Sequence, residues 1–429
     1  MEMEILETAD YLEILKNELA PAQGCTEPVA AALAVARARE LLGMPPEAVE
    51  LAVSTNIFKN AMGVGIPGTR EHGLPMAAAL GAVYGNSEDG LRVLAGMDAE
   101  TESRAKKFLE THPPKITLKS PSPDRLYIRA VCRNGNREAS AVIAGRHDRF
   151  VSEQVDGREL SVPGRKQTDL SENIPLNLAG IYDFIREVPW ENLAFLEQGL
   201  EINRDMAKEG LTGNYGLAVG AGLSDAESQG GRQQEFWKNA VAYAAAACDA
   251  RMDGCPLPVM SLAGSGNMGL TAGLSVDIMA RNRGESDETR LRAVALSQLV
   301  SIHIKRQLGK LSALCGCAVA SSIGASCALV YLWEGGLPEM QNAIRLMIAD
   351  ISGLICDGAK PGCALKIATS LQAAYQCALL AIRRRSPTQR DGIVAKEAED
   401  SIAHLAQLGN IGMKATDETL LQIMLCNQQ

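Results

Sequence analysis

The chain has 429 residues, of which 46% are hydrophobic and 22% are charged, proportions that are ordinary for a folded enzyme of two or three domains. The formal net charge of −9 and the pI near 5.3 disfavour nucleic acid and anionic membrane surfaces as partners. Aromatic residues make up only 4%, whereas alanine and glycine are plentiful, and this composition favours closely packed helices over a β-sandwich.

The N-terminal sequence M-E-M-E-I-L-E-T lacks the basic and apolar regions of a signal peptide. No window reaches the roughly 18 uncharged apolar residues that a transmembrane helix needs. We therefore expect a cytoplasmic protein that is not bound to a membrane. In that reducing compartment the 11 cysteines would stay as free thiols, available as ligands or as small core residues.

Apolar residues recur at helical spacing over residues 5–20, so a first helix is expected there. Pro21 should end it and open the loop that carries Cys25, and an alanine-rich helix should follow over 28–42. A strand and a glycine-rich loop are expected within 49–70. Helices should follow at 74–84 and 101–111, and short β-like runs at 116–119, 126–132 and 139–144.

The helical period dominates from about residue 175 to the end. The glycine-rich segment 211–232 interrupts it and is expected to be a loop with a short helical piece. Helices are predicted over 175–187, 190–209, 233–250, 288–308, 311–334, 337–355, 363–384, 391–408 and 415–427.

These elements predict an α+β fold, mainly α, in which a small mixed α/β lobe is inserted into a large helical catalytic body. We assign the N-terminal helices and the Cys25 loop to residues 1–45 and expect them to pack on the helical body. The small α+β lobe would take residues 46–165. The helical domain, with the iron–sulfur site discussed below, would take residues 166–429.

Two cysteines near the C-terminal end, Cys356 and Cys363, lie in G-L-I-C-D-G-A-K-P-G-C-A-L-K. Turn-forming residues separate them, and Cys363 opens the next predicted helix, whose N-terminal dipole stabilises a thiolate. A loop of this length can bring two thiolates onto one cluster. Because C-x6-C is no standard signature, two small buried core residues fit the spacing equally well.

A third candidate ligand is Cys315 in L-S-A-L-C, at the start of another apolar predicted helix. Cys317 and Cys327 lie close by in the sequence, and spacing alone does not choose among the three. Three converging thiolates in a reducing compartment point to a metal or iron–sulfur site rather than to disulfides. Three ligands in place of four would leave one iron open to a substrate.

Cys25 lies in P-A-Q-G-C-T-E-P, in a turn before the second predicted helix. Thr26 could cap that helix, and Glu27 suits its first turn. A cysteine in this position tends to be accessible and to have a lowered pKa, as reactive thiolates have. The residues alone leave open whether Cys25 is a fourth ligand, a nucleophile, a general base or a structural residue.

Two glycine-rich runs could bind an anion such as a carboxylate. In S-L-A-G-S-G-N-M-G, Ser265 and Asn267 would add side-chain hydrogen bonds, and in K-N-A-M-G-V-G-I-P-G-T, Lys59 and Asn60 stand beside the loop. A plain turn and a surface loop are the alternatives, and neither run matches a nucleotide-binding motif. The five histidines have no metal-binding spacing, so we expect each on the surface or satisfied in the core.

Taken together, P-A-Q-G-C-T-E-P, K-N-A-M-G-V-G-I-P-G-T, A-G-S-G-N-M-G, L-S-A-L-C and G-L-I-C-D-G-A-K-x-x-C-A-L-K resemble the L-cysteine desulfidase family. That family is itself similar to the α-domain of the iron–sulfur L-serine dehydratases. The five motifs occur in the right order from residue 21 to about residue 366, and the helical tail fits as well. The resemblance therefore covers essentially the whole chain.

The resemblance implies an enzyme with a [4Fe–4S] cluster that converts the small molecule L-cysteine into pyruvate, ammonia and hydrogen sulfide. It implies Cys315, Cys356 and Cys363 as cluster ligands and Cys25 as the reactive cysteine, which we take as the general base. Cys317 adds a second thiol beside the expected ligand and could compete for the cluster. The chemistry agrees, because an open iron is a Lewis acid for the leaving sulfur and a thiolate can take the α-proton.

The substrate carboxylate needs an anion site, for which the candidates are Lys59, Asn60, Ser265 and Asn267. The nearest alternative function is the same cluster acting on L-serine, with hydroxide as the leaving group. A pyridoxal-phosphate lyase, with Lys360 or Lys366 as the Schiff base, would need an alternating βα pattern that the sequence lacks. A third alternative is a cysteine or redox sensor without turnover. A homo-oligomer is compatible with the sequence, which does not fix the oligomeric state.

Overall fold

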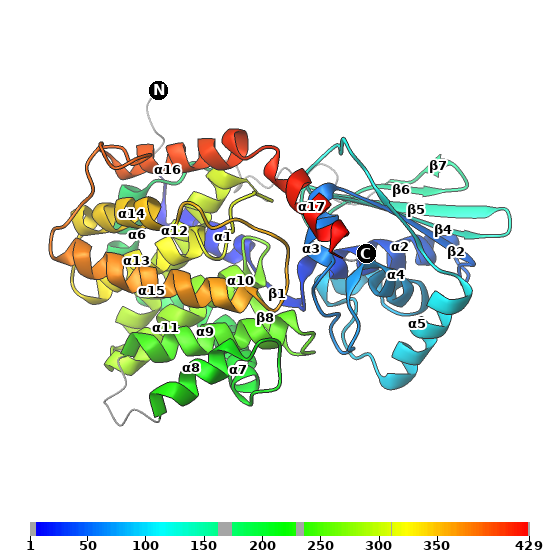
Figure 1. Ribbon diagram of the computed structural model, residues 1–429, viewed down its shortest axis with the longest axis horizontal. Coiled ribbons are helices and arrows are strands. Elements are labelled where there is room, and N and C mark those ends of the chain that lie inside the picture. Colours follow the sequence, from blue (N-terminus) through cyan, green and yellow to red (C-terminus); the bar gives the residue numbers. More distant parts are fainter. Residues whose placement is uncertain (1–5, 162–173, 229–235, 310, 428–429) are drawn as a thin grey trace.

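Figure 1 shows the computed structural model of the chain, which describes residues 6–161, 174–228, 236–309 and 311–427. The described residues form two lobes, each with its own hydrophobic core. The larger one, the helical body, consists almost entirely of helices, and the small lobe combines a sheet with helices. The predicted class, α+β and mainly α with a small mixed lobe, is confirmed.

The small lobe is built on a six-stranded sheet in the order β3-β2-β4-β5-β6-β7, in which only β2 and β3 are parallel. Its strands are β2 (Ala48–Val53), β3 (Lys115–Leu118), β4 (Tyr127–Asn134), β5 (Arg137–Ala144), β6 (Phe150–Val155) and β7 (Arg158–Glu159). Its helices are α2 (Thr26–Leu42), α3 (Thr55–Ala61), α4 (Gly73–Val83), the 3-10 helix η1 (Ser87–Arg92) and α5 (Ala99–Thr111). The predicted β-like runs lie in β3, β4 and β5, whereas β6 and β7 were not predicted.

Helix α2 packs in the small lobe and not on the helical body. Its apolar residues, Leu33 among them, are buried in the same core as Leu51 on β2 and Ile128 on β4. A helix that is apolar on nearly all sides needs packing partners all round, and α2 finds them in the sheet and in α4. This corrects the expectation that residues 1–45 pack together on the helical body: the first helix of that segment contacts α6 and α12 there, whereas the apolar residues of α2 belong to the core of the small lobe.

The helical body gathers most of the remaining described helices around one core. These are α1 (Thr8–Glu18), α6 (Leu178–Glu187), η3 (Trp190–Leu193), α7 (Leu196–Leu211), α8 (Val219–Ser228), α9 (Phe236–Met252), α10 (Gly266–Gly269), η4 (Leu270–Leu274), α11 (Ser275–Arg283), α12 (Asp287–Leu308), α13 (Ala320–Leu332), α14 (Leu337–Ile351), α15 (Cys363–Ile382), α16 (Ala398–Gln407) and η5 (Leu408–Gly412). The last described helix, α17 (Thr416–Cys426), contributes no residue to this core. Most match predicted helices, but α10, η4 and α11 fall in a segment for which none was predicted.

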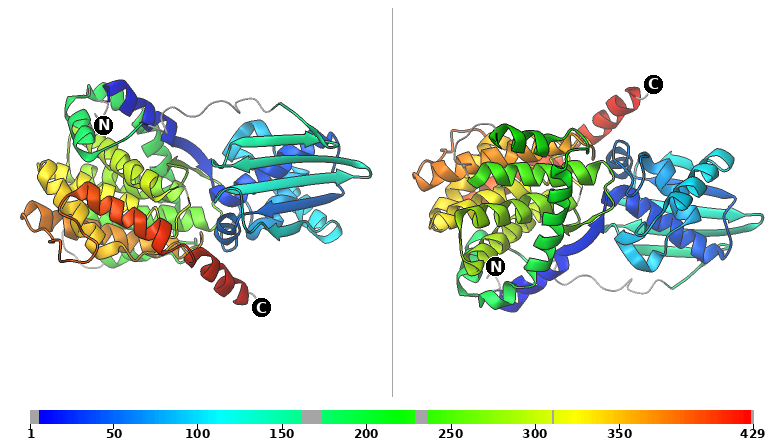
Figure 2. Two further views of the ribbon diagram at one scale, coloured as in Figure 1. Left: turned by 90° about the horizontal axis from the view of Figure 1, so that it is seen from above. Right: turned by 90° about the horizontal axis from the view of Figure 1, so that it is seen from below.

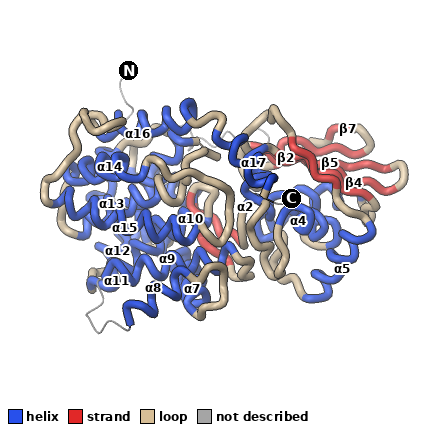
Figure 3. Tube along the Cα trace, viewed as in Figure 1, coloured by secondary structure: helices blue, strands red, loops and turns tan. Residues whose placement is uncertain are grey.

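An antiparallel ribbon of two strands, β1 (Leu19–Gln23) and β8 (Pro258–Leu262), lies where the lobes meet. Figure 3 shows that, among the residues that the structure describes, strands occur in this ribbon and in the small lobe. We had predicted a helix up to residue 20, but α1 ends at Glu18 and Pro21 lies within β1. A proline is tolerated in such an edge strand, where the missing N–H does not break an interior ladder. The ribbon leads directly to the loop of Cys25.

The predicted helix 311–334 is too long at its N-terminal end, because α13 begins at Ala320. The segment before it, which carries Cys315 and Cys317, is a loop. Its apolar, alanine-rich composition suggested a helix. The backbone instead forms hydrogen bonds with the loop that follows α14, a contact between distant segments that local composition does not indicate.

Helix α17 leaves the helical body after η5 and reaches across to α3 of the small lobe (Figures 1 and 2). It is therefore a third connection between the lobes, besides the Cys25 loop and the segment between β7 and α6. Helix α15 is the one described helix that is long and apolar enough to span a membrane by length and composition. It packs against α9, α13 and α14, and a core helix passes the same test.

Candidate functional site

A cavity of about 340 Å³ lies between the lobes, a size suited to a small ligand. All eight residues that the sequence suggested for the site line it: Cys25, Lys59, Asn60, Ser265, Asn267, Cys315, Cys356 and Cys363. They come from both lobes and from segments that lie far apart in the sequence. The structure thus brings the five sequence motifs together around one space, although it does not by itself assign a role to any of them.

Four thiols, which we call the sulfur wall, line one part of the cavity: Cys315, Cys317, Cys356 and Cys363. The loops of Cys315 and Cys356 are joined through their backbones. The amide of Cys315 donates to the carbonyl of Leu354 at 2.9 Å, and the amide of Cys356 donates to the carbonyl of Ala313 at 2.7 Å. These two bonds fix the spacing of the loops and hence of their thiols.

Cys363 is the first residue of α15, as predicted for a thiol at a helix N-terminus. Its thiol donates to the carbonyl of Gly358 at 3.7 Å. Burial raises its pKa to about 12, and burial together with the nearby Cys315 raises the pKa of Cys356. Both groups are therefore protonated thiols at neutral pH in the protein without metal.

Cys315 and Cys317 interact directly, with 3.5 Å between their sulfur atoms. The hydrogen bond from Cys317 lowers the pKa of Cys315 to about 6 in spite of burial, with help from the backbone of Ala318 and the charge of Lys366. The same contact, together with burial, raises the pKa of Cys317 well above its usual value. Cys315 is thus the thiolate of the pair, which suits a first metal ligand.

The donor set of the sulfur wall fits an iron–sulfur cluster better than a single metal ion. Within the described ranges, no three histidine, cysteine, aspartate or glutamate side chains converge on one ion position. In a [4Fe–4S] cluster each cysteine binds a different iron, so its ligands need not converge on a point. Lys305 and Lys366 lie close enough to the thiols to offset part of the negative charge that ligation would create.

Cys25 lies on another part of the cavity wall and precedes α2 directly. Only 3% of the residue is exposed, and its thiol donates to Glu27 Oε2 at 2.9 Å. Burial and the negative charge of Glu27 raise the pKa of Cys25 well above its usual value, against a smaller lowering by Arg251. The expectation of an accessible thiol with a lowered pKa is therefore wrong.

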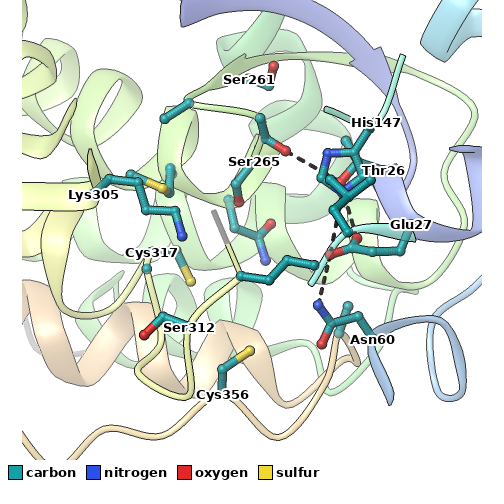
Figure 4. A pocket seen from close by; sticks show the side chains of 18 of the residues that line it. Thr26, Glu27, Asn60, His147, Ser261, Ser265, Lys305, Ser312, Cys317 and Cys356 are labelled. Atoms are coloured by element: carbon teal, nitrogen blue, oxygen red, sulfur yellow. Dashed lines mark hydrogen bonds and ion pairs between the residues drawn. The ribbon is translucent and has the colours of Figure 1, made fainter. Parts of the chain in front are cut away.

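Glu27 is the centre of a buried hydrogen-bond network (Figure 4). Besides Cys25, Thr26 Oγ1 donates to its carboxylate at 3.1 Å and Asn60 Nδ2 at 2.9 Å, and His147 Nε2 lies at 3.9 Å. Burial by itself raises the pKa of Glu27. The charge of His147 and the hydrogen bonds from Cys25 and Asn60 outweigh burial, so the pKa lies below its usual value.

Lys59 is fully buried, and its ammonium group is engaged. Nζ donates to Asp417 Oδ1 on α17 at 2.6 Å and to the carbonyl of Cys356 at 2.7 Å. Asn56 donates to the other oxygen of Asp417 at 2.9 Å. Lys59 therefore ties the small lobe to the sulfur wall, and these contacts make it a weaker candidate for the substrate carboxylate than its sequence position suggested.

Arg251, at the end of α9, was not suggested by the sequence but lines the cavity with only 2% of its surface exposed. Nη1 donates to Asn267 Oδ1 at 2.9 Å, and Nε has no hydrogen-bond partner. A Cβ on Gly266 would lie 2.4 Å from Nε, so only glycine leaves room for the guanidinium. In the part of the chain that the structure describes, no carboxylate forms an ion pair with it.

A model of the family described as "Serine dehydratase alpha chain" matches residues 88–422, which include α5 and strands β3 to β7 of the small lobe and nearly all of the helical body. The chain belongs to the serine dehydratase alpha chain family. The expected relation to the α-domain of the serine dehydratases is thereby confirmed. Family membership makes it a dehydratase-type enzyme, without specifying the substrate.

Relatives named UPF0597 protein match this member of the family along nearly its whole length. The one from Bacteroides thetaiotaomicron is 41% identical over 420 residues, 97% of this chain and 98% of the relative. The one from Oleidesulfovibrio alaskensis is 40% identical and covers 98% of both chains. The one from Clostridium tetani is 39% identical over 427 residues, 97% of this chain and 98% of the relative.

The residues that sequence reasoning missed in this serine dehydratase alpha chain homologue are Glu27, His147, Arg251 and Lys305, all of which line the cavity. Glu27 was read as a helix-start residue, and His147 as a surface or core residue. A signal existed for Glu27, because it stands two residues after Cys25 in the motif. None existed for Arg251 and Lys305, which lie in ordinary helical segments.

Replacing Asp417 with alanine is expected to lower the free energy of unfolding by about 3 kcal/mol, because it leaves the buried Lys59 without its counter-charge. Glu418→Ala is the matched control, since the neighbouring Glu418 is exposed, and it should change stability by less than about 0.5 kcal/mol. Chemical denaturation of both variants measures the difference. Equal free energies of unfolding for the Asp417→Ala and Glu418→Ala variants would show that the contact between α17 and Lys59 does not stabilise the packing of the two lobes.

Proposed function

We propose that the protein is an L-cysteine desulfidase: a carbon–sulfur lyase that carries a [4Fe–4S] cluster and splits L-cysteine into pyruvate, ammonia and hydrogen sulfide. The observation that supports this most is the cavity between the lobes, where Cys25 and the sulfur wall face one space of substrate size. Cys315, Cys356 and Cys363 would hold the cluster. When bound through three cysteines, such a cluster supplies an open iron that acts as a Lewis acid for a leaving atom.

The chain's own residues supply the other needs of a β-elimination. Cys25, which lines the cavity, would take the α-proton, within a network that gives its own proton an acceptor in Glu27. Arg251 offers a buried cation without a counter-ion for the substrate carboxylate. Asn267, which holds Arg251, is joined by Asn60 and Ser265 as further hydrogen-bonding groups on the wall.

The second candidate is an L-serine dehydratase with the same site, which the description of the matching family favours. A pyridoxal-phosphate lyase has less support, because Lys360 and Lys366 both form ion pairs with Asp357. The mainly antiparallel sheet also differs from the alternating βα arrangement that this alternative needs. We place the enzyme in the cytoplasm, where reducing conditions would keep the sulfur wall available for a cluster.

Pyruvate release by anaerobically purified protein, reconstituted with iron and sulfide, tests the function when L-cysteine and L-serine are given in parallel. We expect kcat/KM for cysteine to exceed that for serine at least about tenfold, a difference of about 1.4 kcal/mol in transition-state binding, with sulfide appearing in step. Preference for serine would reassign the enzyme as a dehydratase. No product from either substrate, with the cluster present, would favour a sensor.

Cysteine variants test the proposed ligands. Cys356→Ala and Cys363→Ala should lose cluster iron, whereas Cys25→Ala should keep the iron and lose turnover, because Cys25 is assigned to proton transfer. Cys327→Ala is the control, since Cys327 is buried in α13 away from the cavity, and it should keep both. Iron content and the visible absorption of the cluster are the measurements, and loss of iron from Cys25→Ala would make Cys25 a ligand.

The same measurement on Cys315→Ala and Cys317→Ala decides between the two adjacent thiols. We expect iron to be lost from the Cys315 variant, because Cys315 is the thiolate of the pair. Loss of iron from the Cys317 variant alone would reverse this ligand assignment.

Arg251→Gln should raise KM for L-cysteine by about 10- to 100-fold, since a charged hydrogen bond contributes about 1.5–3 kcal/mol. The effect on kcat should be smaller, because the carboxylate keeps its charge through the reaction. Arg306→Gln is the control: Arg306 also lines the cavity but already pairs with Glu18. An equal KM in the wild type and Arg251→Gln would exclude Arg251 as the carboxylate site.

A further inference from the structure

The pair formed by Cys25 and Glu27 is not arranged as a free thiolate base. The sulfur carries the proton and donates it to Glu27 Oε2 at 2.9 Å, in a region where both residues are buried. A buried thiol that donates a hydrogen bond is a poor base until its proton has moved. The carboxylate is the only acceptor that the structure assigns to that proton.

Glu27 is held as a carboxylate by its surroundings. Thr26 and Asn60 donate to its oxygen atoms at 3.1 and 2.9 Å, and His147 lies 3.9 Å from Oε1. These donors come from the start of α2, from α3 and from the loop after β5, three separate elements that converge on one side chain. Glutamate is seldom fully buried without such partners, so this convergence indicates a site built around the charge.

We infer that Glu27 is the final acceptor of the substrate α-proton and that Cys25 passes the proton to it. The inference rests on the proposed function and deepens it. The Sγ–H bond of Cys25 breaks as its proton moves to Glu27 Oε2, and the sulfur takes the α-proton as the Cα–H bond breaks. The electron pair of that bond forms the Cα=Cβ double bond, and the Cβ–S bond breaks with its pair on the leaving sulfur.

After these steps Cys25 is again a neutral thiol and Glu27 is a protonated carboxyl group. The leaving sulfur has gained the electron pair of the Cβ–S bond. The proton on Glu27 must leave before the next turnover. Apart from Cys25, the titratable side chain in contact with Glu27 is His147, at 3.9 Å from Oε1, and it is 10% exposed, which connects the network to the outside of the cavity. The hydrosulfide that leaves takes up one proton from solvent to become hydrogen sulfide, which balances the proton that Glu27 gives up.

The test uses Glu27→Gln, which keeps the shape of the side chain and removes the basic oxygen. Iron content should match the wild type, and kcat should fall by about 100- to 10,000-fold, the usual contribution of a general base. Exchange of the α-hydrogen of L-cysteine with D₂O should fall in parallel. Glu18→Gln is the matched control, since Glu18 lines the same cavity and loses the same charge, and it should behave as the wild type. Normal turnover by Glu27→Gln would overturn the inference.

A second measurement does not depend on turnover. The rate at which iodoacetamide alkylates Cys25, followed against pH with Cys25→Ala as the background, reports the ionisation of its thiol. In Glu27→Gln the pKa of Cys25 should be lower than in the wild type, because the carboxylate that opposes the thiolate is gone. The other charged or titratable groups that face the pair, Arg251, His147, Lys305 and Cys356, are unchanged in this variant.

The two measurements separate the possible failures. If the wild type forms no product from either amino acid, the proposed function is wrong. The pH dependence of alkylation would still show whether Cys25 and Glu27 share a proton. An unchanged curve in Glu27→Gln would show that they do not, and would contradict the relay even if the enzyme is active.

Discussion

The backbone pairing of the loops before α13 and before α15 is the contact on which the candidate site depends most. Two amide groups, those of Cys315 and Cys356, donate across the gap, and Leu314 and Ile355 complete a short antiparallel bridge. In the described residues neither loop contains a helix or a strand, so neither loop alone would fix the position of its thiol. Joined in this way they form a rigid edge at the floor of the cavity, to which α15 adds Cys363 through its first residue.

The other side of the cavity belongs to the small lobe, so the geometry of the site is also the geometry of the contact between lobes. Lys59 shows how the two are coupled, because one ammonium group contacts α17 through Asp417 and the sulfur wall through the carbonyl of Cys356. A rotation of one lobe against the other would leave this buried charge without partners, at a cost of several kcal/mol. Preorganisation of the thiols relative to Cys25 therefore depends on a structural ion pair.

The sequence predicted the fold class and the members of the site better than it predicted their environment. Helical periodicity located α12, α14 and α15, and the motifs identified eight of the residues that line the cavity. Prediction from the sequence failed where a contact between segments far apart in the chain determines the local structure. The alanine-rich helix α2 looked like a body helix because composition does not say which core receives it, and the Cys315 segment looked helical because its pairing partner lies about 40 residues away.

The environment of Cys25 illustrates the same limit at the level of one residue. A cysteine before a helix is typically acidified by the helix dipole, and this was the basis for expecting a thiolate. The negative charge of Glu27 and burial oppose that effect here, and the partners that keep Glu27 ionised come from two other segments of the chain. A local motif can place a reactive atom, but its protonation state is a property of the folded cavity.

Substrate choice depends on which leaving group the site can release. Carboxylate binding by Arg251 and proton removal by Cys25 with Glu27 would serve L-serine and L-cysteine alike, because neither group acts on the β-substituent. A thiol has a pKa near 8.5 and water one near 15.7, so sulfide leaves far more readily than hydroxide, which needs a proton donor or a strong Lewis acid. Lys305, whose pKa is lowered to about 8 by burial, lies beside Cys317 in the cavity wall (Figure 4). Discrimination between the two amino acids would then depend on how strongly the open iron of the proposed cluster binds the leaving atom, and the affinity of iron for sulfur favours cysteine.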